Sequence, residues 1–529
     1  MIATSGINHG IGSGLMRATH KVLVLLFHTL LLLHLDLAAQ TNEIRALWVD
    51  AFHPGFKSAV EVRQLLQDAR AAHFNTLLVQ VRKRGDAYYQ SHVEPQASDL
   101  SPGFDPLAEI ISQAHSGVPR MDVHAWMILY PVWNSSKIKP TQPNHPFLKH
   151  PEWLTRTREG NTSNEGSHLF DPGHPGVQRH LFDVAMDLVS HYQIDGLHLD
   201  HIRYPGVEWG YNPVSVKRFN QQYDRTGLPA TNDVRWLQFR RNQVTALVRK
   251  IYLSSIALKP KLKLSAATFT GLPSIEKNEE WPQSRAFSSV LQDWRSWMEE
   301  GLLDINIPMS YFRQETNGND IARWQNFIVN HRYSHHAVVG LGFYLNSPSN
   351  TLVQIQSVRL ADASGNRPEG FGCYSYAAAG VNGDFKDLMT SLHQPANEKN
   401  NGTPILETDA TIPAMPWKET PRRGHLRGFV MDASSHSGMD RATIALTGPL
   451  SKTLESDATG FFGSVDLPPG KYQIQATAWN RKPNPTMVSI TPGTVATVNF
   501  ILSPALHPTG SNKTGHPPRT KPKSSSKSR

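Results

Sequence analysis

The sequence predicts a parallel (β/α)8 TIM barrel followed by a small all-β sandwich domain, and three observations support this fold class. Eight short β-rich runs alternate with longer helical patterns between residues 44 and 390, an alternation typical of parallel β-α-β units. Eight such units in roughly 350 residues match the usual size of this barrel. After residue 424 the pattern changes to short alternating strands separated by turns, which is typical of a β-sandwich.

The predicted elements of the barrel alternate in the required order. The eight predicted strands are the runs at 44–50, 74–82, 123–130, 196–202, 262–269, 303–311, 337–344 and 370–376. Helices are predicted at 58–72, 105–116, 176–192, 233–255, 288–301 and 350–361. A doubly wound sheet is the alternative, but it needs a glycine-rich phosphate turn after the first strand. The segment WVDAFHPGF that follows here is not glycine-rich, so the barrel is favoured.

The chain divides into five predicted parts. Residues 1–39 combine a basic start, a leucine-rich core and a small-residue end, as a secretory signal peptide does; Met16, directly before the basic residues, is an alternative start. The other parts are the barrel at 40–390, a linker or wrapping segment rich in Pro, Asn and Thr at 391–423, the β-sandwich at 424–503 and a disordered basic tail at 504–529. The sequence therefore predicts a secreted or periplasmic protein, and association with the cell envelope is compatible with it.

Charge and cysteine content argue against a nucleic-acid partner and exclude an intramolecular disulfide. The formal net charge is +9, but the predicted tail alone carries six basic residues and no acidic one. A sparse basic tail is usually only solvated, so no nucleic-acid partner is predicted. Cys373 is the single cysteine of the chain, so no intramolecular disulfide can form and the fold depends on its core.

The fourth predicted strand lies within IDGLHLDHIRYP at 194–205, where several ionisable side chains follow one another closely. Barrel active sites lie at the carboxyl ends of the strands, and strand side chains alternate between two faces. If Leu197 and Leu199 pack against helices, His198 and Asp200 face the interior. Asp195 lies at the opposite end of the strand, where a structural role is expected.

The same alternation brings further polar and aromatic side chains to the predicted mouth. Gln80 and Arg82 share a face at the end of the second strand, and Asp50 ends the first. Aromatic faces stack on pyranose rings while carboxylate, amide and guanidinium groups bind hydroxyls, so a polysaccharide or oligosaccharide is the predicted ligand. The predicted substrate-binding residues are Asp50, Gln80, Arg82, Asp86, Tyr130, Asn134, His198, Arg203, Tyr204, Tyr311, Tyr344 and Tyr376.

Glycoside hydrolysis normally requires two carboxyl groups on either side of the scissile bond. Asp200 is the first candidate, against the alternative that it only forms a structural salt bridge to Arg203 or Arg82. The second carboxyl is open between Glu315, Asp50, Asp86 and Glu208. Glu315 is preferred because it follows the sixth strand, so Asp200 and Glu315 are the predicted catalytic residues.

Two other functions compete with a hydrolase. His198, Asp200 and His201 could be read as metal ligands, but His201 faces away from the other two in a regular strand. Two ligands alone make a weak metal site. No metal or other cofactor is therefore predicted. The second alternative is a non-catalytic carbohydrate-binding or envelope protein on a barrel scaffold, which the uncertain second carboxyl allows.

Four motifs resemble the glycosyl-hydrolase-like family ten proteins. They are RALWVD at 45–50, NTLLVQVR at 75–82, GDAYYQS with EP at 85–95, and DGLHLDHIRYP at 195–205. The resemblance covers about residues 43 to 390. It implies a (β/α)8 barrel and a glycoside hydrolase acting on cell-envelope or extracellular polysaccharide. The usual acidic pair of that family, Asp-Asp, is Asp200-His201 here, and the lipid-anchor cysteine of many relatives is absent.

The predicted sandwich resembles another family, the carboxypeptidase-regulatory-like, transthyretin-like modules. The resemblance depends on GFVMD at 428–432, SDATGFF at 456–462 and PPGKYQI at 468–474. It implies an accessory module, and no catalytic pattern is visible within it.

Overall fold

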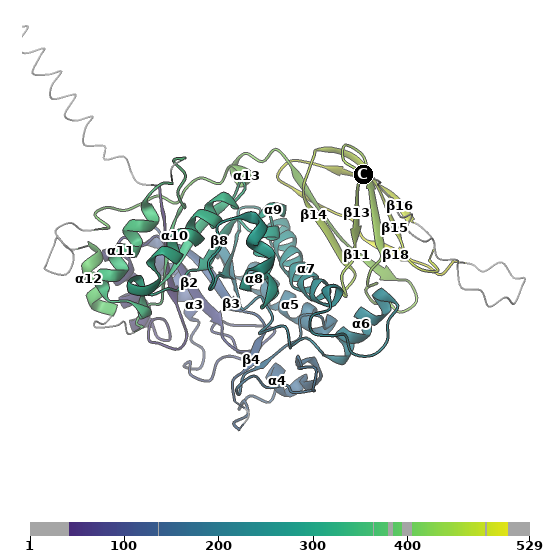
Figure 1. Ribbon diagram of the computed structural model, residues 1–529, viewed down its shortest axis with the longest axis horizontal. Coiled ribbons are helices and arrows are strands. Elements are labelled where there is room, and N and C mark those ends of the chain that lie inside the picture. Colours follow the sequence, from purple (N-terminus) through teal and green to yellow (C-terminus); the bar gives the residue numbers. More distant parts are fainter. Residues whose placement is uncertain are drawn as a thin grey trace, which may run out of the picture.

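The computed structural model describes residues 42–135, 137–362, 364–378, 385–393, 405–481 and 484–505. The predicted signal peptide and the predicted tail beyond residue 505 lie outside these ranges. Figure 1 shows a large part built of strands and helices and, beside it, a smaller all-β part formed by the end of the chain. Within the described ranges, none of the helices combines the length and the apolar character that a bilayer span needs.

The larger part is a closed barrel of eight parallel strands in the order β1-β10-β9-β8-β7-β6-β3-β2, which confirms the predicted fold class. Its strands are β1 (Ile44–Val49), β2 (Thr76–Arg82), β3 (Asp122–Ile128), β6 (Gly196–Asp200), β7 (Lys263–Phe269), β8 (Ile305–Met309), β9 (His336–Gly342) and β10 (Gly370–Tyr374). Each of them falls within or beside a predicted run. A short ribbon of β4 (Pro131–Trp133) and β5 (His168–Leu169) lies in the long connection after β3.

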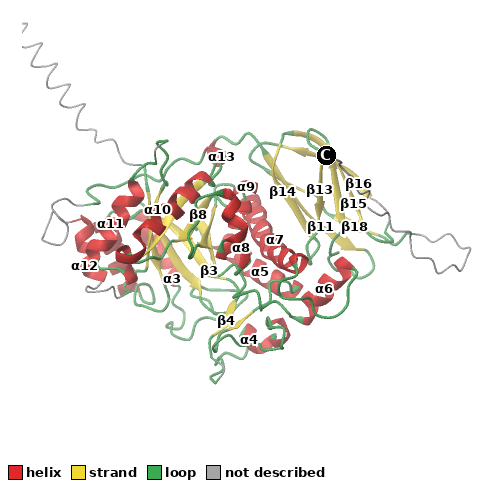
Figure 2. Ribbon diagram, in the orientation of Figure 1, coloured by secondary structure: helices red, strands yellow, loops and turns green. Residues whose placement is uncertain are grey.

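Helices surround the strands (Figure 2). The helices are α2 (Ala59–Ala71), α3 (Pro106–Ser116), α4 (Pro146–Lys149), α5 (Pro175–His191), α6 (Pro213–Tyr223), α7 (Val234–Leu258), α8 (Arg285–Ser288), α9 (Trp294–Glu300), α10 (Gln314–Asn330), α11 (Pro348–Arg359), α12 (Phe385–His393) and α13 (Pro416–Glu419). Side-chain caps set several of their starts. The carboxylate of Asp293 accepts from the N–H of Ser296, so α9 begins at Trp294 and the helix predicted over 288–301 is split.

The alternation of strand side chains separates two layers of core. Leu197 and Leu199 pack in the layer between strands and helices, whereas Trp48 and Trp126 fill the interior of the barrel. A Cβ at position 196 would lie 2.7 Å from the ring of His124, so the interior requires glycine there. Asp195 bonds the side chain of His115 and the N–H of Val123 at the amino-terminal end of the barrel, as predicted.

A segment that follows the barrel closes this amino-terminal end, which we call the floor. Met415 belongs to the same apolar cluster as the interior residues, with Trp417 packed against it. Trp417 donates its indole N–H to the buried carboxylate of Asp304 at 2.8 Å, and Lys418 pairs with the same carboxylate at 3.1 Å. Residues 405–419, within the predicted linker or wrapping segment, therefore lie against the barrel.

The smaller part is a sandwich of two β-sheets over its own apolar core, as predicted. One sheet contains β14 (Phe461–Leu467), β11 (Gly424–Asp432), β17 (Val495–Thr497) and β18 (Phe500–Leu502). The other contains β13 (Lys452–Glu455), β12 (Thr443–Thr447), β15 (Gly470–Thr477) and β16 (Asn484–Ile490).

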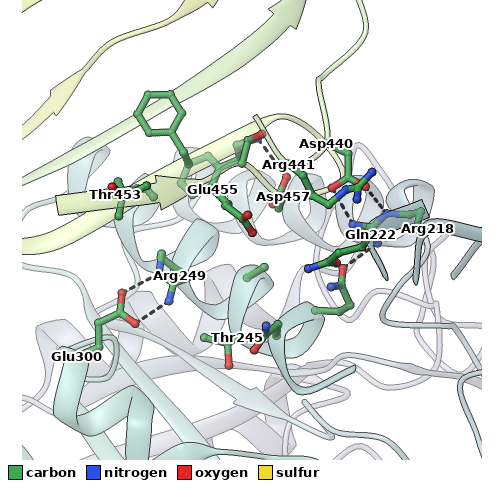
Figure 3. A pocket seen from close by; sticks show the side chains of 18 of the residues that line it. Arg218, Gln222, Thr245, Arg249, Glu300, Asp440, Arg441, Thr453, Glu455 and Asp457 are labelled. Atoms are coloured by element: carbon green, nitrogen blue, oxygen red, sulfur yellow. Dashed lines mark hydrogen bonds and ion pairs between the residues drawn. The ribbon is translucent and has the colours of Figure 1, made fainter. Parts of the chain in front are cut away.

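Helix α7 docks the sandwich onto the barrel through contacts with β11, β14 and β17. Phe461 and Val465 of β14 belong to the apolar core of the barrel. Two ion pairs flank this contact: Arg218 binds Asp440 through two nitrogens at 2.8 and 3.0 Å, and buried Lys250 lies 2.6 Å from Asp457. A polar cavity of about 510 Å³ remains between the two parts (Figure 3).

Replacing Asp457 with asparagine is expected to lower the free energy of unfolding by about 3 kcal/mol, because Lys250 would keep its charge in a buried position without a counter-ion. The exposed pair of Arg323 and Glu276 provides the control, since both side chains are about half exposed. Glu276→Gln should change stability by less than about 1 kcal/mol. Urea unfolding of both variants beside the wild type tests this, and equal effects would contradict the importance of the buried pair.

Candidate active site

Asp200 ends β6 with its side chain inside the barrel mouth, and the side chain is 8% exposed. Its Oδ2 accepts from the indole N–H of Trp126 at 3.2 Å, and its Oδ1 accepts from the N–H of His201 at 2.6 Å. Burial alone would raise the pKa of Asp200, but the nearby His201 and Arg203 outweigh it and hold that pKa below the usual 3.8. Asp200 is therefore a carboxylate at neutral pH, able to act as a base or nucleophile but not as a proton donor.

The residue after Asp200 explains why the strand stops. His201 adopts a left-handed backbone conformation with φ of 49°, which breaks the alternation that would have turned it away. Its ring therefore lies close enough to Asp200 to influence the pKa of that carboxyl. Burial lowers the pKa of His201 itself to about 4, so its ring is neutral near pH 7.

Arg203 borders the same carboxylate. Its Nη1 lies 3.6 Å from Oδ1 of Asp200, and its guanidinium lies over the ring of Phe269. That Nη1 is buried and has no hydrogen-bond partner among the described residues. Because an unpaired buried donor is costly, this nitrogen is well placed to bind an oxygen of a ligand.

Aromatic side chains line the mouth opposite Asp200. The ring centroid of Tyr374 lies 5.4 Å from that of Tyr311, 5.9 Å from that of Tyr344 and 6.2 Å from that of Trp126. Burial raises the pKa of Tyr374, and the carboxylates of Asp50 and Asp200 raise it further. Tyr374 therefore lies between the ends of β1 and β6, and the predicted residues Tyr311 and Tyr344 belong to this aromatic wall. Tyr374 was not among the predicted site residues, which include Tyr376 from the same strand end instead.

Asp50 and Gln80 lie at the carboxyl ends of the neighbouring strands β1 and β2. The carboxylate of Asp50 is enclosed: it accepts from the N–H groups of Phe52 and His53 and bonds the ring of His53 at 2.9 Å and the hydroxyl of Ser375. Gln80 accepts from the N–H of Ala51 at 2.7 Å, and its buried amide nitrogen has no partner among the described residues. Gln80 can thus donate to a ligand, whereas Asp50 positions other groups.

His53 is a candidate that sequence reasoning missed. Its side chain is 41% exposed, and its Nδ1 is fixed by buried Asp50. A carboxylate that orients an imidazole is a common arrangement at acid–base sites. The signal in the sequence is the Asp-x-x-His spacing directly after the first strand.

His198 points into the barrel as predicted, but both of its nitrogens are engaged. Its Nε2 accepts from the indole N–H of Trp48 at 3.0 Å, and its Nδ1 bonds the hydroxyl of Ser265 at 2.9 Å. Burial lowers the pKa of His198 to about 3, so the ring is neutral. These bonds leave neither nitrogen for a substrate or a metal, and His198 instead supports the strand beneath Asp200.

Arg82 does not face the mouth. Two residues of β2 lie opposite one residue of β3 between Gln80 and Arg82, and Arg82 pairs with Met127, whose side chain packs in the outer layer. This β-bulge turns Arg82 outward. There it binds Glu94 through two bonds of 2.8 Å, and Glu94 also bonds His180 at 2.7 Å. Arg82 is thus half of a fully buried ion pair.

Three predicted tyrosines also leave the mouth because they follow the ends of their strands. Tyr130 and Tyr204 are fully buried in the outer layer, and their hydroxyls have no partner among the described residues. Tyr376 donates to Asp68 of α2 at 2.7 Å. Alternation predicts direction only within a regular strand, and β10 ends at Tyr374.

The remaining predicted residues lie in connections above the strands. Glu315 is exposed in the first turn of α10, where it accepts from Asn350 at 3.1 Å. Asp86 accepts from the N–H of Arg84, and Asn134 and Glu208 are exposed in loops. Within the described part of the chain, no hydrogen bond joins Asp200 to a second carboxyl group.

Comparisons with known proteins agree with this architecture. The family described as glycosyl hydrolase-like 10 matches residues 43–347, and the carboxypeptidase regulatory-like domain matches residues 425–503. Glycosyl hydrolase YngK of Bacillus subtilis (strain 168) is 25% identical over 428 residues, which cover 75% of this chain and 79% of that protein.

Two further proteins are similar over shorter or more divergent regions. Glycosyl hydrolase DigH of Escherichia coli (strain K12) is 27% identical over 294 residues, which cover 51% of this chain and 62% of that protein. The PgaB (BpsB) glycoside hydrolase domain from Bordetella bronchiseptica has 12% identity and a TM-score of 0.44, over 63% of this chain and 94% of that one. Because the family match spans more than half of the chain, and the barrel it lies on is present, the protein belongs to the glycosyl hydrolase-like 10 family.

Proposed function

We propose that the protein is a glycoside hydrolase that cleaves an extracellular or cell-envelope polysaccharide at the barrel mouth. The observation that carries the proposal is the ionised carboxylate of Asp200, held inside the mouth beside Arg203 and opposite an aromatic wall. Aromatic faces and a few convergent polar groups suit a sugar ring. The family and the printed names of the relatives support the reaction class, and the predicted signal peptide supports a location outside the cytoplasm.

In the proposed mechanism Asp200 is the base or the nucleophile, because its lowered pKa makes it a poor proton donor. The donor is then a second carboxyl, and we assign it to Glu315. Glu315 is exposed at the start of α10, next to Gln314, whose N–H donates to the side chain of Asn346 in the connection after β9. Arg203 and the amide of Gln80 bind hydroxyl groups, while Tyr311, Tyr344 and Tyr374 stack on rings.

The proposal is tested by incubating the purified protein with peptidoglycan and a panel of polysaccharides and measuring new reducing ends. Asp200→Asn, Glu315→Gln and Glu208→Gln are assayed in parallel. Glu208 is the control, because it is an exposed carboxyl in the connection after β6 that takes no part in the proposed mechanism. The expected result is release by the wild type and Glu208→Gln, and strong loss in the other two. Binding without release by the wild type would instead support the non-catalytic carbohydrate-binding alternative.

The pH dependence of kcat/KM should identify Asp200 as the ionised partner. Since its pKa lies below 3.8, activity should persist as the pH falls to about 3.8 and decline only below it. The alkaline limb reports the proton donor. Initial rates at low substrate concentration measure both limbs, on protein shown by circular dichroism to remain folded. An acid limb well above pH 4 would exclude Asp200 as the group whose ionisation is required.

A further inference from the structure

Two histidines and an aspartate converge on the outer surface of the barrel, away from the mouth. His92 comes from the connection after β2, and Asp187 and His191 lie one turn apart at the end of α5. One ligand atom of each lies within 4.8 Å of the other two. The Nδ1 atoms of His92 and His191 lie 2.8 and 3.0 Å from the same oxygen, Oδ1 of Asp187.

The carboxylate is held in place by its other oxygen. Oδ2 of Asp187 accepts from the N–H of His92 at 3.0 Å and from the hydroxyl of Ser91 at 3.1 Å. The side chain of Asp187 is only 4% exposed. Outer-shell hydrogen bonds of this kind orient metal-binding carboxylates, and here they direct Oδ1 toward both imidazoles.

The two histidines are free to present Nδ1 as a lone-pair donor. Their side chains are 67% and 52% exposed, and neither Nε2 has a recorded partner within the described residues. The ring proton can therefore move to Nε2, where water accepts it. Nδ1 of His191 lies 3.0 Å from both Oδ1 and the backbone oxygen of Asp187. A hydrogen bond shared between two acceptors is weak, so a metal ion can replace it at little cost.

Space and geometry both allow an ion. Tetrahedral coordination at about 2.0–2.1 Å places ligand atoms about 3.3 Å apart, so each Nδ1 needs to lie only about 0.3–0.5 Å farther from Oδ1 than the 2.8 and 3.0 Å observed. Both histidines line a hollow of about 460 Å³, together with Gln90 and Tyr192. A water in this hollow can complete the four ligands.

We propose that His92, Asp187 and His191 bind one divalent transition-metal ion of the Zn²⁺ class. The mixture of two imidazoles and one carboxylate favours such ions over Ca²⁺ or Mg²⁺, which prefer all-oxygen sites. The site lies at the carboxyl end of α5, just before Tyr192 and on the side of the floor. It fixes the connection after β2 to α5, and it is independent of glycoside cleavage at the mouth.

The test is binding of Zn²⁺ alone to full-length protein that has been stripped with a chelator. Titration calorimetry and metal analysis after gel filtration should give one tight equivalent more for the wild type than for the double variant His92→Ala, His191→Ala. Because outer-shell changes already cost 10–100-fold in affinity, loss of both ligands should weaken this site by at least about 100-fold. Co²⁺ in the same site should give the visible absorption bands of tetrahedral coordination.

The chain has 25 histidines, so weak binding elsewhere is expected and needs a matched control. His115→Ala removes another partly exposed histidine bonded to an aspartate, 2.7 Å from Asp195, and should leave the tight equivalent unchanged. Zn²⁺ should also raise the Tm of the wild type and of His115→Ala but not that of the double variant. Equal stoichiometry and affinity in the wild type and the double variant would overturn the proposal, whatever the outcome of the polysaccharide assays.

Discussion

Replacing Glu94 with glutamine is expected to lower the free energy of unfolding by about 3–5 kcal/mol. Glu94 accepts two bonds from Arg82 and one from His180, and the side chains of Glu94 and Arg82 are completely buried. Removing the negative charge leaves the guanidinium of Arg82 in a position where water cannot reach it. Such an uncompensated charge costs far more than the loss of a surface pair.

Urea or thermal unfolding, followed by circular dichroism, measures the effect. Glu299→Gln is the matched control, because Glu299 is 55% exposed and lies 3.6 Å from Arg295. It should change stability by less than about 1 kcal/mol. A loss of similar size in the two variants would show that the buried pair contributes no more than an exposed one.

The pH dependence of stability provides an internal check on Glu94. Burial would raise its pKa, but Arg82 and His180 lower it from 4.5 to about 2. A depressed folded-state pKa means that this stabilisation is complete above pH 4.5 and is lost as the pH falls toward 2. The shift corresponds to about 3 kcal/mol. The stability difference between the wild type and Glu94→Gln should therefore shrink over this interval.

Replacing Asp200 with asparagine is expected to reduce kcat/KM by about 10²–10⁴-fold. Asparagine keeps the shape of the side chain and an oxygen that can accept from Trp126 or His201, but it lacks the charge that the proposed reaction needs. Its Tm should therefore change little compared with its activity. Steady-state kinetics on whichever polysaccharide the panel identifies measure the effect, and undiminished turnover would remove Asp200 from the mechanism.

The stereochemistry of the wild-type product distinguishes the two roles open to Asp200. If Asp200 is a nucleophile, the released sugar should retain its anomeric configuration; if Asp200 activates water, the released sugar should show inversion at the anomeric carbon. In Asp200→Ala, azide can occupy the space that the carboxylate leaves and attack the anomeric carbon in its place. Azide should therefore restore turnover and give a glycosyl azide in either case, which tests whether Asp200 acts on the face opposite the leaving group.

The sequence was sufficient to predict the barrel and the direction of side chains inside regular strands. Leu197, Leu199, His198 and Asp200 all lie on the expected faces, because a strand has a period of two residues and its outer face must be apolar. The same argument failed for Arg82, because one extra residue between Gln80 and Arg82 reverses the face to which the Arg82 side chain points. It also failed for His201 and Tyr376, which follow the last residue of their strands.

Contacts between distant segments account for the rest of the site. His53 gains its orientation from Asp50 and Asp50 in turn bonds Ser375, which is 325 residues away in the chain. Glu94 meets Arg82 and His180 only because the connection after β2 folds back over α5. No local pattern encodes such meetings, so a single sequence predicted the carboxylate of Asp200 but not the groups that support it.

The closed floor limits how the protein can be cut into fragments. A fragment ending at residue 390 would contain every strand of the barrel, yet it would leave the buried carboxylate of Asp304 without Trp417 and Lys418 and would expose the apolar residues that Met415 covers. A fragment ending at residue 347, where the family match stops, would also lack β10 and leave β1 and β9 as open edges. The smallest fragment expected to fold on its own as a barrel therefore extends to about residue 420, just before the first strand of the sandwich.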